Sequence, residues 1–335
     1  MSRSVGAVAR WLAGATIVGV IVWRLGTGPF LHGLHAVDGR SLALAAGIGF
    51  VTTVCAAWRW HLVARGLGVA VPLGTATAAY YRSQLLNTVL PGGVLGDVDR
   101  AVRHGSEVGD VGRGLRAVVW ERSAGQFVQL VLGLLVLLLL PSRLPTWLPL
   151  VIAAVVVGAL GCGLLLRGRP PRGASRGARA FRTAISDIRG GLLAPHIGPG
   201  VALASVVVVS GHLATLLLAA RTAGAISPTT HLLPLAMLVL LATAVPTNIG
   251  GWGPREGVAA WAFGAAGLGA AQGVATATVY GLLSLAAISP AAPLLAAAWL
   301  RRPGHPGDAL PPQGIPQKSA DLVPAAARSE GGGCG

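Results

Sequence analysis

The residues of this chain best suited to bind a charged ligand lie beside a break in an otherwise apolar stretch. Residues 82–100, RSQLLNTVLPGGVLGDVDR, contain Arg82, Asn87, Asp97 and Arg100. Arginine side chains and free backbone N–H groups can hold a phosphate, while carboxylates balance those cations or bind a cationic group. We therefore predict a substrate-binding role for these four residues.

A second stretch has the same character. Residues 240–257, LLATAVPTNIGGWGPREG, carry Asn248, Arg255 and Glu256 after another proline and a pair of glycines. Proline ends a helix because it lacks an N–H, and glycine adopts backbone conformations closed to other residues. The positions expected to form the two breaks are Pro91, Gly92, Gly93, Gly96, Pro246, Gly250, Gly251 and Gly253.

Both breaks are predicted to be tips of re-entrant hairpins. Lipid cannot satisfy free backbone groups, so a non-helical segment at membrane depth must be buried in protein or line a wet cavity. Gly/Pro-interrupted segments in the two halves of a chain also point to an inverted repeat with its site at the midplane. With opposite entry, Arg100 is expected to pair with Glu256, and Asp97 with Arg255.

Glu121 and Arg122 lie near the start of a later apolar stretch. Neighbours on a helix do not face each other, so each of these residues needs another partner or water. Ionisable residues inside spans are candidates for a functional site. The sequence leaves two interpretations equally open, namely substrate-binding residues or anchors at the membrane interface.

The composition is that of an integral membrane protein. The chain has 335 residues, of which 53% are hydrophobic and 11% charged, far from the average of soluble domains. Its net charge of +15 comes mostly from arginines between apolar segments, where they act as topology signals rather than as a nucleic-acid surface. The cysteine spacing fits neither a disulfide framework nor a metal site, and we expect no metal and no cofactor.

We predict an all-α membrane protein with about six transmembrane helices plus the two hairpins. Residues 1–300 form the polytopic domain, with a first half 1–140, a basic cytoplasmic loop 167–196 and a second half 197–300; residues 301–335 are expected to be a disordered cytoplasmic tail. The arginine distribution predicts that both termini lie in the cytoplasm, and we expect the protein to be in the plasma membrane. The expected spans are residues 11–25, 41–63, 117–140, 147–166, 201–220 and 272–300.

Two further polar residues lie inside predicted spans. Arg59, flanked by Trp58 and Trp60, is interpreted as a snorkelling arginine in an aromatic belt at the interface. A lone histidine such as His212 more often forms a hydrogen bond to a neighbouring helix than it takes part in catalysis.

Three segments together resemble the flippase-like membrane domain of the lysylphosphatidylglycerol synthase family: LLNTVLPGGVLGDVDRA, the VWER that opens the next span, and PTNIGGWGPREG. The resemblance extends to about residue 300, and this chain departs from the family pattern at the second break by adding Arg255. In that family the membrane domain is associated with moving a lipid between leaflets, and a separate soluble domain makes the aminoacylated lipid. We expect no such soluble domain after residue 300.

The function predicted from these features is handling or translocation of an anionic phospholipid or a polyprenyl-phosphate carrier between leaflets. The alternative is a non-transporting accessory or scaffold subunit of an envelope-building complex, in which the charged motifs lock the fold. An enzyme is the least favoured class, because no HExxH or P-loop motif occurs. Expected partners are membrane lipids and an envelope-biosynthesis protein, and no nucleic acid.

Overall fold

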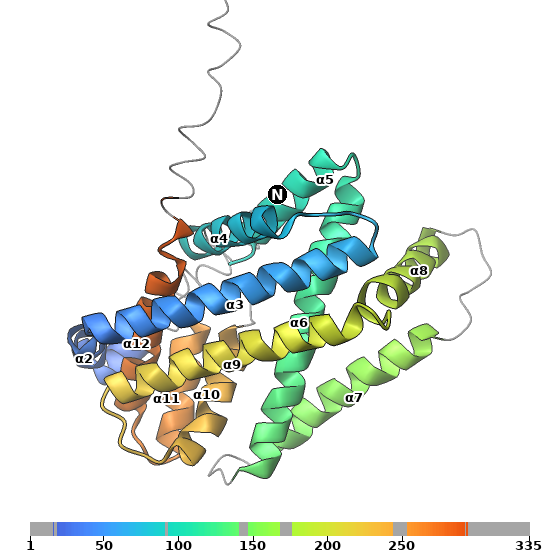
Figure 1. The fold of residues 1–335 in the computed structure, drawn as a ribbon. Coiled ribbons are helices and arrows are strands. Elements are labelled where there is room, and N and C mark those ends of the chain that lie inside the picture. Colours follow the sequence, from blue (N-terminus) through green and yellow to red (C-terminus); the bar gives the residue numbers. More distant parts are fainter. Residues whose placement is uncertain are drawn as a thin grey trace, which may run out of the picture. The chain divides into compact units, whose positions relative to one another are not determined.

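The part of the chain that the structure describes folds into helices (Figure 1). The structure is a computed structural model, and it describes residues 16, 19–90, 93–140, 147–167, 176–243, 253–291 and 293. The helices are α2 (Gly28–Ala36), α3 (Gly39–Gly66), α4 (Leu73–Val89), α5 (Leu95–Glu107), α6 (Val111–Leu139), α7 (Trp147–Arg167), α8 (Arg176–Asp187), the π-helix η1 (Ile188–Leu192), α9 (Gly198–Thr222), α10 (Thr229–Thr243), α11 (Pro254–Ala265) and α12 (Ala270–Ile288).

Four of the described helices are long and apolar enough to cross a membrane, namely α3, α6, α9 and α12. A stretch of α7 and the whole of α10 are shorter apolar helices. The prediction of an all-α membrane protein is therefore confirmed. The count of six spans stays a prediction, because part of the first expected span and the end of the last one lie outside the described residues.

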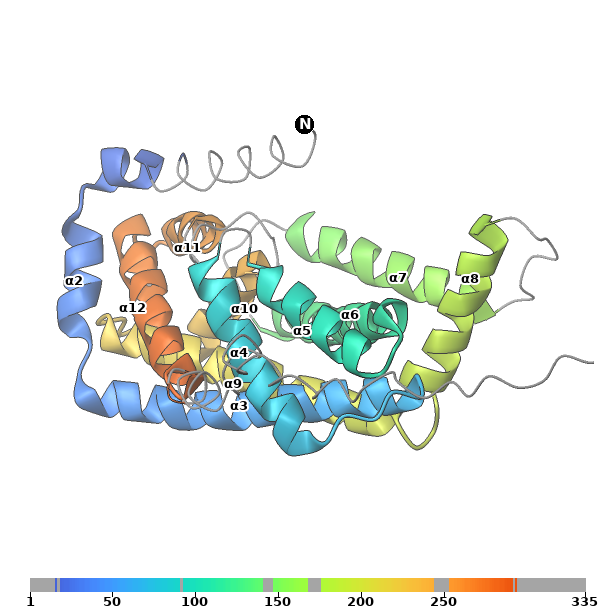
Figure 2. The same ribbon diagram turned by 90° about the horizontal axis from the view of Figure 1, so that it is seen from above.

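Helices α3 and α9 pack closely and run antiparallel. A Cβ atom on Gly211 would lie 2.2 Å from the Cγ2 atom of Thr52, and one on Gly200 would lie 2.8 Å from Leu62. Asp38 begins α3 by accepting a 2.8 Å hydrogen bond from the Ser41 backbone N–H, which holds the pKa of this carboxyl below its usual range. Helix α6 crosses behind the α3–α9 pair in Figure 1, and Figure 2 shows the same order from above.

Helices α4 and α5 form the first predicted hairpin. A Cβ atom on Gly96 would lie 2.1 Å from the carbonyl oxygen of Ser83, so only glycine permits this approach of the two backbones. Gly93 has a φ of 62°, in the left-handed region. The polar residues that follow the hairpin are mostly helical, because α5 continues to Glu107 and α6 begins at Val111.

The second predicted hairpin is built from α10 and α11, which contact each other. Gly253 has a φ of 126° and precedes Pro254, the first residue of α11. The tips of both breaks lie outside the described residues, including Pro91, Gly92, Pro246, Asn248, Gly250 and Gly251. The inverted repeat and the meeting of the two tips therefore remain predictions.

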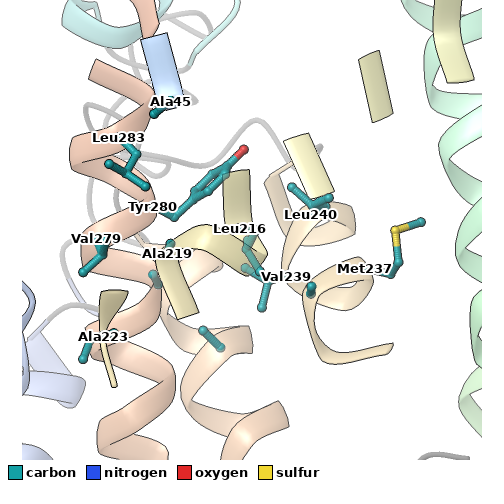
Figure 3. Packing of buried hydrophobic residues seen from close by; sticks show 14 of the residues in the cluster. Ala45, Leu216, Ala219, Ala223, Met237, Val239, Leu240, Val279, Tyr280 and Leu283 are labelled. Atoms are coloured by element: carbon teal, nitrogen blue, oxygen red, sulfur yellow. The ribbon is translucent and has the colours of Figure 1, made fainter. Parts of the chain in front are cut away.

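A hydrophobic cluster joins α3, α9, α10 and α12 and fixes the positions of these helices. Its fully buried members include Leu216, Met237, Val239 and Leu283, and Tyr280 of α12 lies among them with its hydroxyl at one edge (Figure 3). Burying a side chain of this size contributes about 1.5 to 3 kcal/mol when its surface leaves water. In a bilayer, tight packing of the same side chains takes over that role.

The basic segment between α7 and α9 is helical over much of its length, rather than a simple loop. Asp187, at the end of α8, accepts hydrogen bonds from Arg116 Nε at 2.9 Å and from Trp120 Nε1 at 3.2 Å. Both donors belong to α6. The acid that interrupts the arginine-rich sequence thus ties α8 to a candidate membrane span. The predicted tail, residues 301–335, lies outside the described residues.

Candidate functional site

Five ionisable side chains from three helices form one buried cluster, called here the ion cluster. Arg59 comes from α3, Asp97 and Arg100 come from α5, and Glu121 and Arg122 come from α6. All but Arg122 are buried. The α4–α5 hairpin therefore brings its acid and arginine against two of the long apolar helices.

Glu121 is the centre of the ion cluster and is fully buried. Its Oε1 atom accepts hydrogen bonds from Arg59 Nε at 2.7 Å and from the Tyr80 hydroxyl at 3.0 Å. Its Oε2 atom accepts one from Arg100 Nη2 at 3.2 Å. A buried carboxylate must have such partners, because an isolated charge in a low-dielectric interior is strongly unfavourable.

Asp97 is the second carboxylate of the ion cluster. Its Oδ1 atom accepts hydrogen bonds from Ser83 Oγ at 2.9 Å and from Arg100 at 3.1 Å. Its Oδ2 atom accepts one from Asn87 Nδ2 at 3.1 Å and pairs with Arg122. Each carboxylate oxygen of the cluster thus has at least one donor from the protein itself.

Asn87 closes the turn of the first hairpin. Besides its bond to Asp97, its Oδ1 atom accepts a 2.7 Å hydrogen bond from the Gly96 backbone N–H. This amide joins the end of α4 to the start of α5. Local side-chain bonds of this kind are typical of asparagine at turns.

Arg100 is held between aromatic rings as well as carboxylates. Its Cζ atom lies 4.1 Å from the ring centre of Tyr80 and 4.6 Å from that of Trp60. Its Nε and Nη1 atoms have no hydrogen-bond partner among the described residues. Cation–π attraction, about 2 kcal/mol or more when desolvated, offsets part of this loss.

The ion cluster carries one positive charge in excess. It contains three arginines and two carboxylates, and 3 − 2 leaves +1. The excess is accessible at Arg122, whose side chain is 43% exposed, whereas Glu121 is fully buried and the Asp97 side chain is 10% exposed. Arg122 Nε also has no hydrogen-bond partner among the described residues. The cluster therefore presents one incompletely paired guanidinium to its surroundings.

Two adjoining cavities open beside Arg122, with volumes of about 210 Å³ and 260 Å³. Both are lined by Thr52, Gln84, Arg122 and His212, and together they are called here the central cavity. Its walls come from α3, α4, α6, α9, α10 and α12. The other described polar residues that line it are Thr53, Arg59, Tyr80, Asn87, Thr88, Gln126, Gln129, Thr215, Thr243, Tyr280 and Ser284.

The lining of the central cavity is rich in amides and hydroxyls and has no carboxylate among the described residues. Arg122, Gln126 and Gln129 follow one another at spacings of four and three, which places them on one face of α6. The amides of Gln126 and Gln129 have no hydrogen-bond partner among the described residues. Because polar groups inside a membrane protein need partners, this face is built to meet water or a polar ligand.

His212 of α9 and Tyr280 of α12 form a further polar pair in the lining of the central cavity. The Tyr280 hydroxyl lies 3.4 Å from His212 Nδ1, and both side chains line the cavity. The expected hydrogen bond between His212 and a neighbouring helix is therefore present.

Arg82, Arg255 and Glu256, which were also predicted as site residues, do not line the central cavity. Arg82 pairs with Asp99 at 3.2 Å, and neither residue lines the central cavity. Arg255 pairs with Glu256 through its Nε atom at 2.8 Å, and Glu256 also accepts a 2.7 Å hydrogen bond from the Gly253 N–H.

The predicted pairing across the two halves is therefore wrong. Arg100 pairs with Asp97 and Glu121, and Glu256 pairs with its neighbour Arg255. The physical reason is local: α5 and α6 pack together, which brings complementary charges into contact without the second half. Asn248 lies outside the described residues.

Arg59 and the cavity glutamines were missed as site residues. The interpretation of Arg59 as an interface anchor is wrong, because its side chain is buried against Glu121 and its Nη1 atom donates a 3.2 Å hydrogen bond to Ser205. The sequence contains features that could have identified Arg59 and the glutamines as site residues. Arg59 is an ionisable residue inside the apolar stretch expected over residues 41–63, and Arg122, Gln126 and Gln129 have helical spacing.

Comparison with known protein families agrees with the assignment to an all-α membrane protein. Comparisons with curated proteins and with solved structures gave no match. A family model described as the lysylphosphatidylglycerol synthase TM region matches residues 10–292, which include every described helix. With its long apolar helices, the chain is a membrane-embedded protein related to lipid handling. It belongs to the family of the lysylphosphatidylglycerol synthase transmembrane region.

Proposed function

We propose that this protein moves an anionic lipid or lipid-linked carrier between leaflets, with its head group in the central cavity. The observation that carries the proposal is the exposed guanidinium of Arg122 in a polar cavity whose described lining has no carboxylate. An anionic head group would neutralise the excess charge of the ion cluster. Arginine offers a phosphate several donors in a fixed geometry.

The walls of the central cavity carry hydrogen-bond donors that could replace the water lost by a head group on entry. A phosphate transferred into a low-dielectric interior needs donors already in place, because solvent no longer supplies them. The Gln126 and Gln129 amides supply such donors along the cavity. The acyl or prenyl chains of the lipid would remain in the bilayer, where they meet the exposed apolar side chains of the long helices.

The test is transport in proteoliposomes. The purified full chain is reconstituted with a fluorescent anionic phospholipid or a fluorescent polyprenyl phosphate, and movement between leaflets is followed by quenching the outer leaflet. The wild-type chain is expected to exchange the probe, and Arg122→Gln to slow exchange at least about tenfold, since a charge-assisted hydrogen bond contributes about 1.5 to 3 kcal/mol.

Arg103→Gln is the matched control. Arg103 pairs with Asp99, has a side chain 53% exposed, and does not line the cavity. The same substitution there should leave exchange unchanged. Equal rates with the wild-type chain and with empty liposomes, for both classes of probe, would contradict the proposal.

The alternative, a scaffold or accessory subunit of an envelope-building complex, has one observation in its favour. Arg59, Arg100, Asp97 and Glu121 are buried and paired, as expected of a structural lock. The double change Asp97→Asn with Arg100→Gln separates the two functions, because it keeps the net charge. If the double variant folds better than either single variant, the buried pairs act as a lock. If that variant also retains full cellular function without exchanging any lipid probe in proteoliposomes, the scaffold is favoured.

The location, the orientation and the partners of the protein are part of the same proposal. We propose a plasma-membrane location with both termini in the cytoplasm, no catalytic activity, and membrane lipids as the partners, together with an envelope-biosynthesis protein in the scaffold case. The arginine distribution supports the orientation.

A further inference from the structure

We infer that the outward side of α8 and η1 is a docking surface for the acidic phospholipids of the adjacent leaflet. The surface, called here the basic face, consists of Arg179, Arg182, Ser186 and Arg189, and none of these residues lines the central cavity. The inference goes beyond the proposed function and does not depend on it, because a scaffold subunit would use such a surface equally well.

The residues of the basic face are aligned along the helix. Arg179, Arg182 and Ser186 follow one another at spacings of three and four, which places them on one side of α8, and all three are exposed. Arg189 follows Ser186 by three residues, in η1, and is also exposed. Arginines that serve only as topology signals must lie near the ends of spans, but they need no such alignment. The alignment indicates an extended cationic surface.

The inward side of α8 is fixed on the protein and carries the acid of this segment. Ile185 is 4% exposed and Asp187 is 7% exposed. Asp187 accepts the hydrogen bonds from Arg116 and Trp120 of α6, so its carboxylate is turned away from the basic face. Residues 176–192 contain four arginines and this one acid, and 4 − 1 leaves +3. The basic face therefore keeps its positive charge.

The basic face lies where apolar helices end. In Figures 1 and 2, α8 lies beside the end of α7 and the end of α3. A Cβ atom on Gly66, the last residue of α3, would lie 2.7 Å from the carbonyl oxygen of Gly190 in η1. Arg65 is exposed at the same end and has no acidic partner among the described residues. Because α3 is long and apolar enough to cross a membrane, its end marks the level of a membrane surface.

An acidic leaflet suits this position better than a soluble acidic partner does. The apolar stem of arginine lets a guanidinium reach the lipid phosphates from a helix at the interface, and the guanidinium can bind a phosphate with two parallel hydrogen bonds. Each arginine near an anionic membrane surface increases association about fivefold. This attraction falls off within a Debye length of about 10 Å, so it requires a surface that lies at the leaflet.

The test measures how closely lipids approach the basic face. The full chain, with its three native cysteines replaced, carries a bimane label attached through Ser186→Cys and is placed in phosphatidylcholine nanodiscs. Phosphatidylglycerol or phosphatidylcholine with a nitroxide near the head group is then added at increasing mole fraction. Half-maximal quenching by phosphatidylglycerol is expected at a mole fraction at least about fivefold lower. Salt at about 1 M should remove most of this preference, because the Debye length falls to about 3 Å.

Variants assign the preference to the arginines. Arg179→Gln with Arg182→Gln should bring the two mole fractions together. Arg24→Gln with Arg40→Gln is the matched control, because it removes two charges from exposed arginines, and Arg40 lies at the opposite end of α3. This control should keep the full preference. Arg122→Gln should keep it as well, which would exclude a lipid in the central cavity as the quencher.

Three results would overturn the inference. One is half-maximal quenching at equal mole fractions of the two lipids in the labelled chain with all its arginines. Another is a label that neither lipid quenches, because the basic face would then point away from the leaflet and be open to a soluble acidic partner. The third is a full preference in the Arg179→Gln, Arg182→Gln variant. None of these results bears on the proposed function, which fails or stands by lipid exchange through the central cavity.

Discussion

Glu121 and Arg122 are neighbours in α6 with opposite charges, yet each pairs with different residues from other helices. Glu121 pairs with Arg59 of α3 and Arg100 of α5, whereas Arg122 pairs with Asp97 of α5. The offset of about 100° between neighbours on a helix turns one carboxylate into the cluster and one guanidinium toward the cavity. One dipeptide thus contributes to both the buried part of the ion cluster and the exposed lining of the central cavity.

Glu121→Gln is expected to destabilise the protein by about 3 to 5 kcal/mol, because Arg59 and Arg100 both lose their shared carboxylate in a buried site. Glutamine has nearly the same volume, so the effect reports charge rather than packing. Thermal unfolding in detergent measures it. Glu107→Gln is the control, since the Glu107 side chain is 69% exposed and should tolerate the change. Similar unfolding temperatures for the two variants would contradict a central role for Glu121.

Gly96→Ala should separate α4 from α5. The added methyl group would lie 2.1 Å from the Ser83 carbonyl oxygen, so the hairpin must open or shift. Overpacking of this kind costs about 1 to 3 kcal/mol or more. The measurement is the unfolding temperature together with lipid exchange. Gly47→Ala is the matched control, because nothing lies within 4 Å of a Cβ at that position, and it should be neutral or slightly stabilising.

Asp187→Asn should loosen α8 from α6, because the carboxylate that receives both Arg116 and Trp120 is lost. Limited proteolysis within the basic segment is expected to become several-fold faster, while cleavage elsewhere is unchanged. Asp99→Asn serves as the comparison, since Asp99 is partly exposed and bonded to Arg82 and Arg103. A rate equal to that of the wild-type chain would mean that other contacts hold α8.

The orientation is tested by cysteine labelling. In a background with the three native cysteines replaced, a cysteine at Ser175 should resist a membrane-impermeant reagent in intact cells, whereas one at Pro145 should react. The expectation follows from the arginines that surround Ser175. Labelling at Ser175 from outside would reverse the proposed orientation.

The sequence predicted the long helices well because apolar length is a local property. The expected span over residues 201–220 corresponds to α9, Gly198–Thr222, and the one over residues 41–63 to α3, Gly39–Gly66. The helix–break–helix form of the first hairpin also followed from local chemistry at Pro91 and the glycines. Such features depend on the backbone of a few neighbouring residues.

The partners of the charges were not predictable in the same way. Arg59 looked like an interface residue because its flanking tryptophans resemble an aromatic belt, and its partner Glu121 lies 62 residues away. The cavity depends on which faces of six helices turn inward, and apolar length carries no information about that. The polar face formed by Arg122, Gln126 and Gln129 was the one local sequence feature that indicated the cavity.

The 62 residues between Arg59 and Glu121 also affect how the chain inserts into the membrane during synthesis. Arg59 leaves the ribosome well before Glu121, and at about 5 to 20 residues per second the interval lasts several seconds. During that time α3 carries a cation into the bilayer without its carboxylate, at a cost of about 2.5 to 3.5 kcal/mol on insertion scales. That cost is offset only once α6 supplies Glu121, so full stabilisation of α3 in the bilayer is expected to follow the synthesis of α6.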